Sequence, residues 1–127
     1  MQRPFTVDSL DHMVLHVRDI EKSVAFYRMF GGDEIDVIAG GGNTRVPLGP
    51  TQRLLLCHDP NYVPPPQGNL NHFSLVLDGS RPIDEVLDYV RAHGAEPYDG
   101  PKDNGRGYVQ FRVNDPDGNE IELRINK

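Results

Sequence analysis

Cysteines, long apolar runs and clusters of positive charge are all scarce in this chain of 127 residues. Its single cysteine, Cys57, cannot form an internal disulfide, so a reducing cytoplasm is the expected location. The apolar runs fall far short of the roughly 20 residues that cross a bilayer, and residues 1–8 lack the apolar core of a signal peptide. We therefore expect neither a membrane span nor secretion.

The balance of charge excludes a further class of partner. Thirteen Lys and Arg residues against nineteen Asp and Glu residues give a net charge of −6. The basic residues form no cluster that could follow a phosphate backbone, so nucleic-acid binding is not expected. With 37% hydrophobic residues, the chain is long enough to bury a core without disulfides. We expect one domain over residues 8–126.

The chain does contain the same order of elements twice. The periodicity and turn residues of the first half predict a strand, a helix capped by Asp19 and three further strands, at 11–17, 19–30, 33–39, 44–48 and 53–58. An extended linker is expected at 61–70. The second half repeats the order, with its helix opened by Ser80 and Pro82, at 71–77, 80–93, 95–98, 107–113 and 119–125. The fold class is therefore α+β, with two βαβββ modules at about 8–60 and 71–126 that pair with each other.

Alternation along the strands divides each of them into an apolar and a polar face. In the first strand Met13, Leu15 and Val17 form the apolar face, which we expect to pack against a helix. The polar faces of the two opening strands carry His12 and His72, and that of the last strand carries Glu122. These faces could line the other side of a curved sheet. They could equally be solvated, as on any half-covered antiparallel sheet.

Two neutral imidazoles and one carboxylate form a familiar ligand set for a divalent metal with open coordination positions. His12, His72 and Glu122 supply that set if the two modules bring them together. The carboxylate, in place of a thiolate, favours Fe, Mn, Ni or Zn. Such an ion could polarise a carbonyl, chelate two neighbouring oxygens or stabilise an enolate.

Other polar residues on these faces have a structural and a functional interpretation. His16 lies on the same face as His12 and could be a general base or a histidine bonded to a neighbour. Arg112 could receive an anionic substrate group or pair with Glu120 or Glu122. Candidate substrate-contacting residues on the polar faces are Tyr108, Gln110 and Ser74. No Gly-x-Ser-x-Gly elbow or strand-loop-helix phosphate cradle is present, so we expect neither a hydrolase triad nor a nucleotide site.

Several motifs resemble the vicinal-oxygen-chelate superfamily, which includes glyoxalases, bleomycin-resistance proteins and extradiol dioxygenases. The motifs are Leu10-Asp11-His12, Ser23-Val24-Ala25-Phe26-Tyr27-Arg28, Asn71-His72-Phe73 and the closing run from Asp115-Pro116-Asp117-Gly118 to Leu123. The resemblance implies an open β-cup with helices on its convex side, usually completed in a homodimer. It also implies metal ligands at His12, His72 and Glu122.

Departures from the family's patterns narrow the activity. Glyoxalase I enzymes usually have a fourth ligand where this chain has Leu55, and extradiol dioxygenases usually have a tyrosine where it has Arg112. Fosfomycin-resistance thiol transferases have a hydroxyl residue where it has Val14. These departures leave open whether the reaction is a lyase or isomerase, dioxygenase or thiol-transfer reaction.

The sequence thus predicts a divalent-metal enzyme acting on a small oxygenated substrate, with or without an anionic group. His16 or a metal-bound hydroxide is the candidate base, and Arg112 is the residue expected to orient the substrate. Two other classes stay open: a non-catalytic protein that sequesters a small molecule in the cup, and a scaffold whose polar faces hold only water.

Overall fold

A computed structural model describes residues 1–31, 36–37, 43–66 and 72–126 of the chain. It consists of two units, residues 1–62 and 63–127, which we call the N-terminal and C-terminal units and describe separately. The boundary between Tyr62 and Val63 falls within the segment expected to be a linker.

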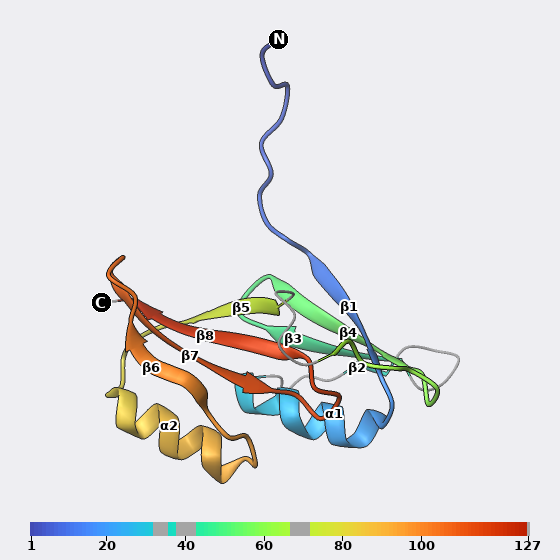
Figure 1. The fold of residues 1–127 in the computed structure, drawn as a ribbon. Helices are drawn as coiled ribbons and strands as arrows, with labels where there is room; N and C mark the ends of the chain where they lie inside the picture. The colour runs from blue at the N-terminus through green and yellow to red at the C-terminus, as the bar shows by residue number, and fades with distance from the viewer. Residues whose placement is uncertain (32–35, 38–42, 67–71, 127) are drawn as a thin grey trace. The chain divides into compact units, whose positions relative to one another are not determined.

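The N-terminal unit is built on a four-stranded sheet in the order β1-β4-β3-β2. Its strands are β1 (His12–Val17), β2 (Asp36–Val37), β3 (Thr44–Leu48) and β4 (Gln52–His58). Helix α1 (Ile20–Tyr27) and the 3-10 turn η1 (Arg28–Phe30) follow β1, and α1 lies against β3 and β4 (Figure 1). The Asp19 carboxylate accepts a hydrogen bond from the Lys22 backbone N–H, as its predicted capping role requires.

The C-terminal unit repeats this plan with a sheet in the order β5-β8-β7-β6. Its elements are β5 (His72–Leu77), α2 (Ile83–Ala92), β6 (Tyr98–Asp103), β7 (Tyr108–Asn114) and β8 (Glu120–Asn126). Helix α2 follows its N-cap residue Pro82, ends before Gly94, which has a φ of 84°, and buries Leu87 and Val90. The predicted α+β class, with two small open sheets and few helices, is confirmed. Neither helix in the described part of the chain is long and apolar enough to span a bilayer.

Equivalent residues of the two units occupy the same positions in their ladders. The first strand of each unit is parallel to its last strand, and the last strand is antiparallel to the one before it. In the N-terminal sheet Leu55 pairs with Val14 and Arg45. In the C-terminal sheet Glu122 pairs with Ser74 and Arg112. Leu55 therefore occupies in the N-terminal sheet the position that Glu122 has in the C-terminal sheet.

Burial follows the predicted alternation. In β1 the polar-face residues His12, Val14 and His16 are exposed, whereas Val17 is fully buried. In β7 and β8 the apolar faces are almost completely buried, at Phe111, Val113, Ile121 and Leu123. Removal of these side chains from water supplies the main favourable term for each unit, at about 25 cal/mol per Å² of apolar surface.

Two details of the second half differ from the expectation. The strand predicted at 95–98 lies at Tyr98–Asp103 instead, because the Ala95 N–H bonds back to the Val90 carbonyl and Pro97 has no N–H to donate. Ser80 does not cap α2: its N–H and hydroxyl both bond to Asp78. Of the strand predicted at 33–39, residues 36–37 form β2, and the others lie outside the described residues.

Candidate functional site

One face of the C-terminal sheet collects most of the predicted site residues. Residues paired across a ladder share a face, so the registers define this surface. One row runs from Ser74 through Glu122 to Arg112, and the next runs from Val76 through Arg124 to Gln110. We call this surface the polar face of the C-terminal sheet; it consists of His72, Ser74, Val76, Tyr108, Gln110, Arg112, Asn114, Glu120, Glu122, Arg124 and Asn126.

Two of the three predicted metal ligands approach each other on this face. His72 Nε2 lies 3.7 Å from Glu122 Oε2, and the two side chains are 28% and 13% exposed. That separation is too long for a hydrogen bond. Two ligand atoms that are each about 2.1 Å from one ion lie roughly 3.0–3.4 Å apart at octahedral or tetrahedral angles. The pair therefore needs to close by only a few tenths of an ångström to hold a metal, and its N/O donors suit Fe, Mn, Ni or Zn.

The third predicted ligand, His12, belongs to the N-terminal unit, and one of its ring nitrogens bonds to a neighbouring carboxylate. Its Nδ1 lies 2.7 Å from Asp11 Oδ2. Because a carboxylate only accepts hydrogen bonds, Nδ1 carries a proton, and in the neutral ring the lone pair is therefore on Nε2. The hydrogen bond from His12, aided by Arg53 Nη2 at 3.7 Å from Asp11 Oδ1, lowers the pKa of Asp11. A metal-binding histidine commonly has such a carboxylate on its second nitrogen.

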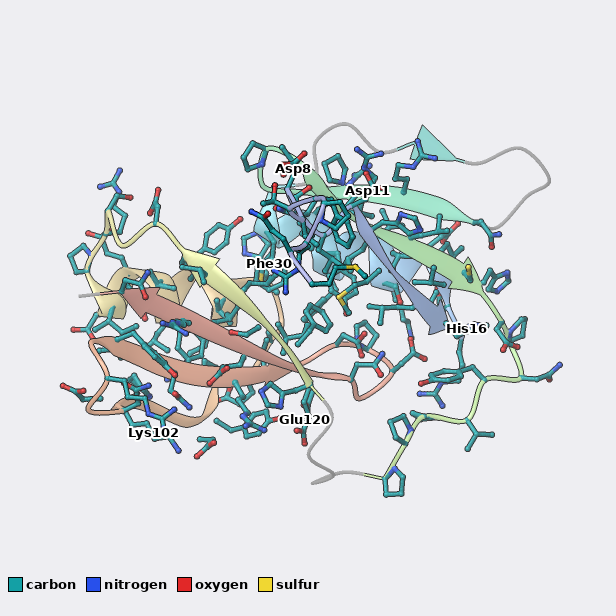
Figure 2. All side chains as sticks on the ribbon, turned by 90° about the horizontal axis from the view of Figure 1, so that it is seen from above. Asp8, Asp11, His16, Phe30, Lys102 and Glu120 are labelled. Carbon is teal, nitrogen blue, oxygen red and sulfur yellow. The ribbon has the colours of Figure 1, made fainter. Side chains whose placement is uncertain are left out.

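His16 stands at the other end of β1, on the same face as His12. Figure 2 shows Asp11 at the start of the strand and His16 at its arrowhead. His16 Nδ1 lies 3.3 Å from Asp59 Oδ2, and the ring lies near Tyr62, with centroids 5.9 Å apart. The Asp59 backbone N–H donates to the Val17 carbonyl, and the Asp59 carboxylate accepts a hydrogen bond from the Asn61 N–H. The bonded-histidine interpretation is thus confirmed, and it leaves Nε2 of a half-exposed imidazole directed away from Asp59.

Arg112 is held by two carboxylates. Its Nη1 lies 3.1 Å from Glu120 Oε2, and its Nε lies 3.6 Å from Asp99 Oδ2. Glu120 is 9% exposed and Arg112 is 21% exposed, so the pair is largely shielded from water. Of the alternatives drawn from the sequence, the ion pair with Glu120 is therefore confirmed. An orienting role for Arg112 toward substrate stays a prediction.

Sequence reasoning missed three residues of these surroundings. Asp11 and Asp59 act through the histidines that they hold, and Arg124 lies over the ring of Tyr108, with Cζ 3.5 Å from the centroid. The position of Asp11 next to His12 could have predicted its contact with that ring. The alternation of β8 could have placed Arg124 on the same face as Glu122. Asp59 lies 43 residues from His16, so no local pattern links them. Among the described residues neither unit contains a group of three metal-binding side chains by itself.

With this geometry, the comparisons with known proteins identify the class. The family model for the Glyoxalase/Bleomycin resistance protein/Dioxygenase superfamily matches residues 9–123. The chain belongs to this superfamily. The "Glyoxalase domain-containing protein RDO1" of Mycosarcoma maydis is 28% identical over 130 residues, covering 96% of this chain and 70% of that protein.

Solved structures agree on the fold. A glyoxalase/dioxygenase from Nostoc punctiforme has a TM-score of 0.78 at 22% identity, over 100% of this chain and 97% of that one. A mutant of the genomically encoded fosfomycin resistance protein FosX from Listeria monocytogenes has a TM-score of 0.74 at 21% identity, over 96% and 93%. That FosX structure is a complex with Mn(II) and 1S,2S-dihydroxypropylphosphonic acid. At these identities the likeness concerns the fold alone.

Proposed function

We propose that this chain is a divalent-metal enzyme of the superfamily, with His12, His72 and Glu122 as its metal ligands. Its substrate is a small molecule with adjacent oxygen atoms. The 3.7 Å approach of His72 Nε2 to Glu122 Oε2 carries the proposal, because it brings an imidazole and a carboxylate together on a half-shielded sheet face. The Asp11 carboxylate gives further support, since its bond to Nδ1 fixes the tautomer of the neutral His12 ring in which Nε2 carries the lone pair.

The ligand set determines the chemistry that a bound ion would contribute. An ion held by His12, His72 and Glu122 would keep positions open for two substrate oxygens and would stabilise negative charge that develops on them. The identity of the ion among Fe, Mn, Ni and Zn is left open by the proposal. FosX, which shares the fold, binds Mn(II), and this supports a transition metal rather than a purely structural use of the three side chains.

His16 is the proposed general base. Its Nδ1 donates to Asp59, so the lone pair of Nε2 is available to accept a proton from a substrate carbon or hydroxyl. Asp59 fixes the tautomer and the orientation of the ring. Ser74 and Gln110, in the two rows of the polar face that contain Glu122 and Arg124, are the proposed substrate contacts.

Metal analysis of the full chain tests the proposal. We expect about one transition-metal ion per chain after exposure to Mn(II), Ni(II) or Zn(II) and desalting. The variants His12→Ala, His72→Ala and Glu122→Gln should each lose it. His93→Ala is the matched control, because its Nδ1 bonds to the Tyr89 carbonyl at the end of α2. Retention of the metal by all three ligand variants would refute the metal site.

The second candidate function is sequestration of a small molecule without catalysis, as in bleomycin-resistance proteins. Capture of a ligand by a protein that takes up no metal would favour it.

We also propose that the chain forms a homodimer in a reducing cytoplasm. Each sheet has an outer strand, β1 or β5, that pairs within its own sheet on one side only, and Cys57 is a free thiol. Light scattering on purified protein tests the dimer.

A further inference from the structure

The polar face of the C-terminal sheet and the adjoining strand β6 carry three cationic side chains, and their surroundings differ. Arg112 contacts Glu120 and Asp99, as described above. Lys102, which pairs with Gln110 across the ladder, has its Nζ 2.9 Å from Asp99 Oδ1. Both of these charges are thus compensated by carboxylates of the same unit. An anion that approached either residue would have to compete with a carboxylate already in place.

Arg124 is different. Its Nε donates to Asn126 Oδ1 at 3.3 Å, and its guanidinium lies over the ring of Tyr108. No carboxylate in the described part of the chain lies within ion-pair distance of it. Stacking on an aromatic ring stabilises a guanidinium without neutralising its charge, and it leaves the edge of the planar fork open to hydrogen-bond acceptors.

The position of Arg124 relates it to the predicted metal ligand. Glu122 and Arg124 are two residues apart in β8, so their side chains project from the same face about 6.5–7 Å apart along the strand. Neighbouring strands place Ser74 beside Glu122 and Gln110 beside Arg124. A small molecule whose oxygen atoms bind beside Glu122 therefore lies only a few bond lengths from the guanidinium of Arg124.

We propose that Arg124, held by Tyr108, is the anion receptor of the site and that the substrate carries an oxyanion group, a carboxylate or a phosphonate. The proposal rests on the proposed function for the position of the rest of the substrate. It assigns the orienting role predicted for Arg112 to Arg124 instead. Arg124 presents two parallel N–H donors to two oxygens of the anion, the geometry in which arginine binds carboxylates and phosphonates most strongly.

Anion titrations of the full chain test this inference without a metal. Methylphosphonate and acetate have no second chelating oxygen beside the anionic group, so their binding reports on the fork alone. We expect two-dimensional NMR shifts at Tyr108, Gln110 and Arg124, and Arg124→Gln should weaken binding roughly tenfold to hundredfold. Arg124→Lys should retain part of the affinity, because it keeps the charge and loses the fork. Comparison of the two anions identifies the preferred oxyanion.

The matched control is Arg106→Gln, which removes a cation from the exposed β6–β7 loop of the same unit. Its affinity for methylphosphonate should equal that of the unchanged protein. Equal losses in the two variants, or no binding by the unchanged protein, would overturn the inference. The amide spectrum of each variant shows whether the sheet is intact.

Metal uptake separates this inference from the proposed function. Arg124→Gln keeps all three proposed ligands, so it should bind metal like the unchanged protein. If metal binding is absent while the anion affinity still depends on Arg124, the anion receptor stands and the metal enzyme fails. If metal binds while Arg124→Gln leaves the anion affinity unchanged, the assignment of Arg124 as anion receptor is refuted and the proposed metal enzyme stands.

Discussion

His12 donates a hydrogen bond from Nδ1 to the Asp11 carboxylate at 2.7 Å, and Arg53 lies on the far side of that carboxylate. If His12 binds a metal through Nε2, Asp11 orients the ring and raises its basicity. We expect Asp11→Asn to weaken metal binding about 10-fold to 100-fold, measured by competition with a fluorescent chelator. Asp8→Asn is the control, since Asp8 belongs to the exposed segment before β1. Equal affinities of the two variants would contradict a supporting role for Asp11.

The repeat allows a ligand to be added as well as removed. Leu55 occupies the ladder position that Glu122 has in the other unit, with Arg45 across from it as Arg112 is across from Glu122. We expect Leu55→Glu to create a second imidazole–carboxylate pair with His12 and to tighten metal binding by about tenfold, or about 1.4 kcal/mol. Calorimetric titration measures it. Leu55→Gln has the same shape without the charge, and an equal gain in that variant would argue against ligation.

The two arginines of the polar face should differ in their effect on stability. Arg112→Met removes the cation that lies 3.1 Å from the largely buried Glu120 carboxylate, so we expect a loss of about 2–4 kcal/mol in the free energy of unfolding. Arg124→Met removes a stacking contact worth about 0.5–1 kcal/mol. Urea denaturation compares them. A larger loss at Arg124 would show that the assignment of structural and binding roles is reversed.

Period-two alternation predicted the faces of β1, β5, β7 and β8 correctly, because a strand that covers a core on one side must alternate. The partners on the polar face were not predictable. Whether Arg112 pairs with Glu120 or Glu122 depends on side-chain geometry between neighbouring rows of the ladder. The bond between His16 and Asp59 joins the end of β1 to the turn after β4, which no local pattern encodes.

Strand β6 shows where local patterns fail. Its ladder with β7 has a register shift between Tyr98 and Lys102, and Asp99 has a φ of 52°. A Cβ at Gly100 would collide with the Gln110 carbonyl oxygen, so this position requires glycine. A strand containing Asp, Gly and Pro has little intrinsic β-propensity, and its pairing with β7 forms despite its composition.

The assignment of faces can be tested through stability. Leu123 is fully buried on the apolar face of β8, whereas Val76 is 61% exposed on the polar face of β5. Truncation in the core removes buried apolar surface and leaves a cavity, so we expect Leu123→Ala to cost about 2–5 kcal/mol. Val76→Ala should change the free energy of unfolding by less than about 0.5 kcal/mol. Similar costs in urea denaturation would mean that the two faces of the sheet are not distinct.

The last prediction concerns pH. The hydrogen bond from Lys102 lowers the pKa of Asp99 below its ordinary value, with a smaller contribution from Arg112. A carboxyl group whose pKa is lower in the folded state stabilises the fold above its unfolded pKa, and that contribution is lost as the pH falls through the folded pKa. Lys102→Met should therefore be less stable than the unchanged protein at neutral pH. The difference between the two should shrink as the pH falls below about 4.

Urea denaturation at a series of pH values measures this difference. Lys22→Met is the control, because its backbone N–H, rather than its ammonium group, contacts the neighbouring acidic residue Asp19. Asp99 is exposed, so added salt should reduce the effect at Lys102. A stability gap between the Lys102 variant and the unchanged protein that stays constant down to strongly acidic pH would show that the Lys102–Asp99 bond is not its source. In that case the loss would come from the packing of the Lys102 stem along β6.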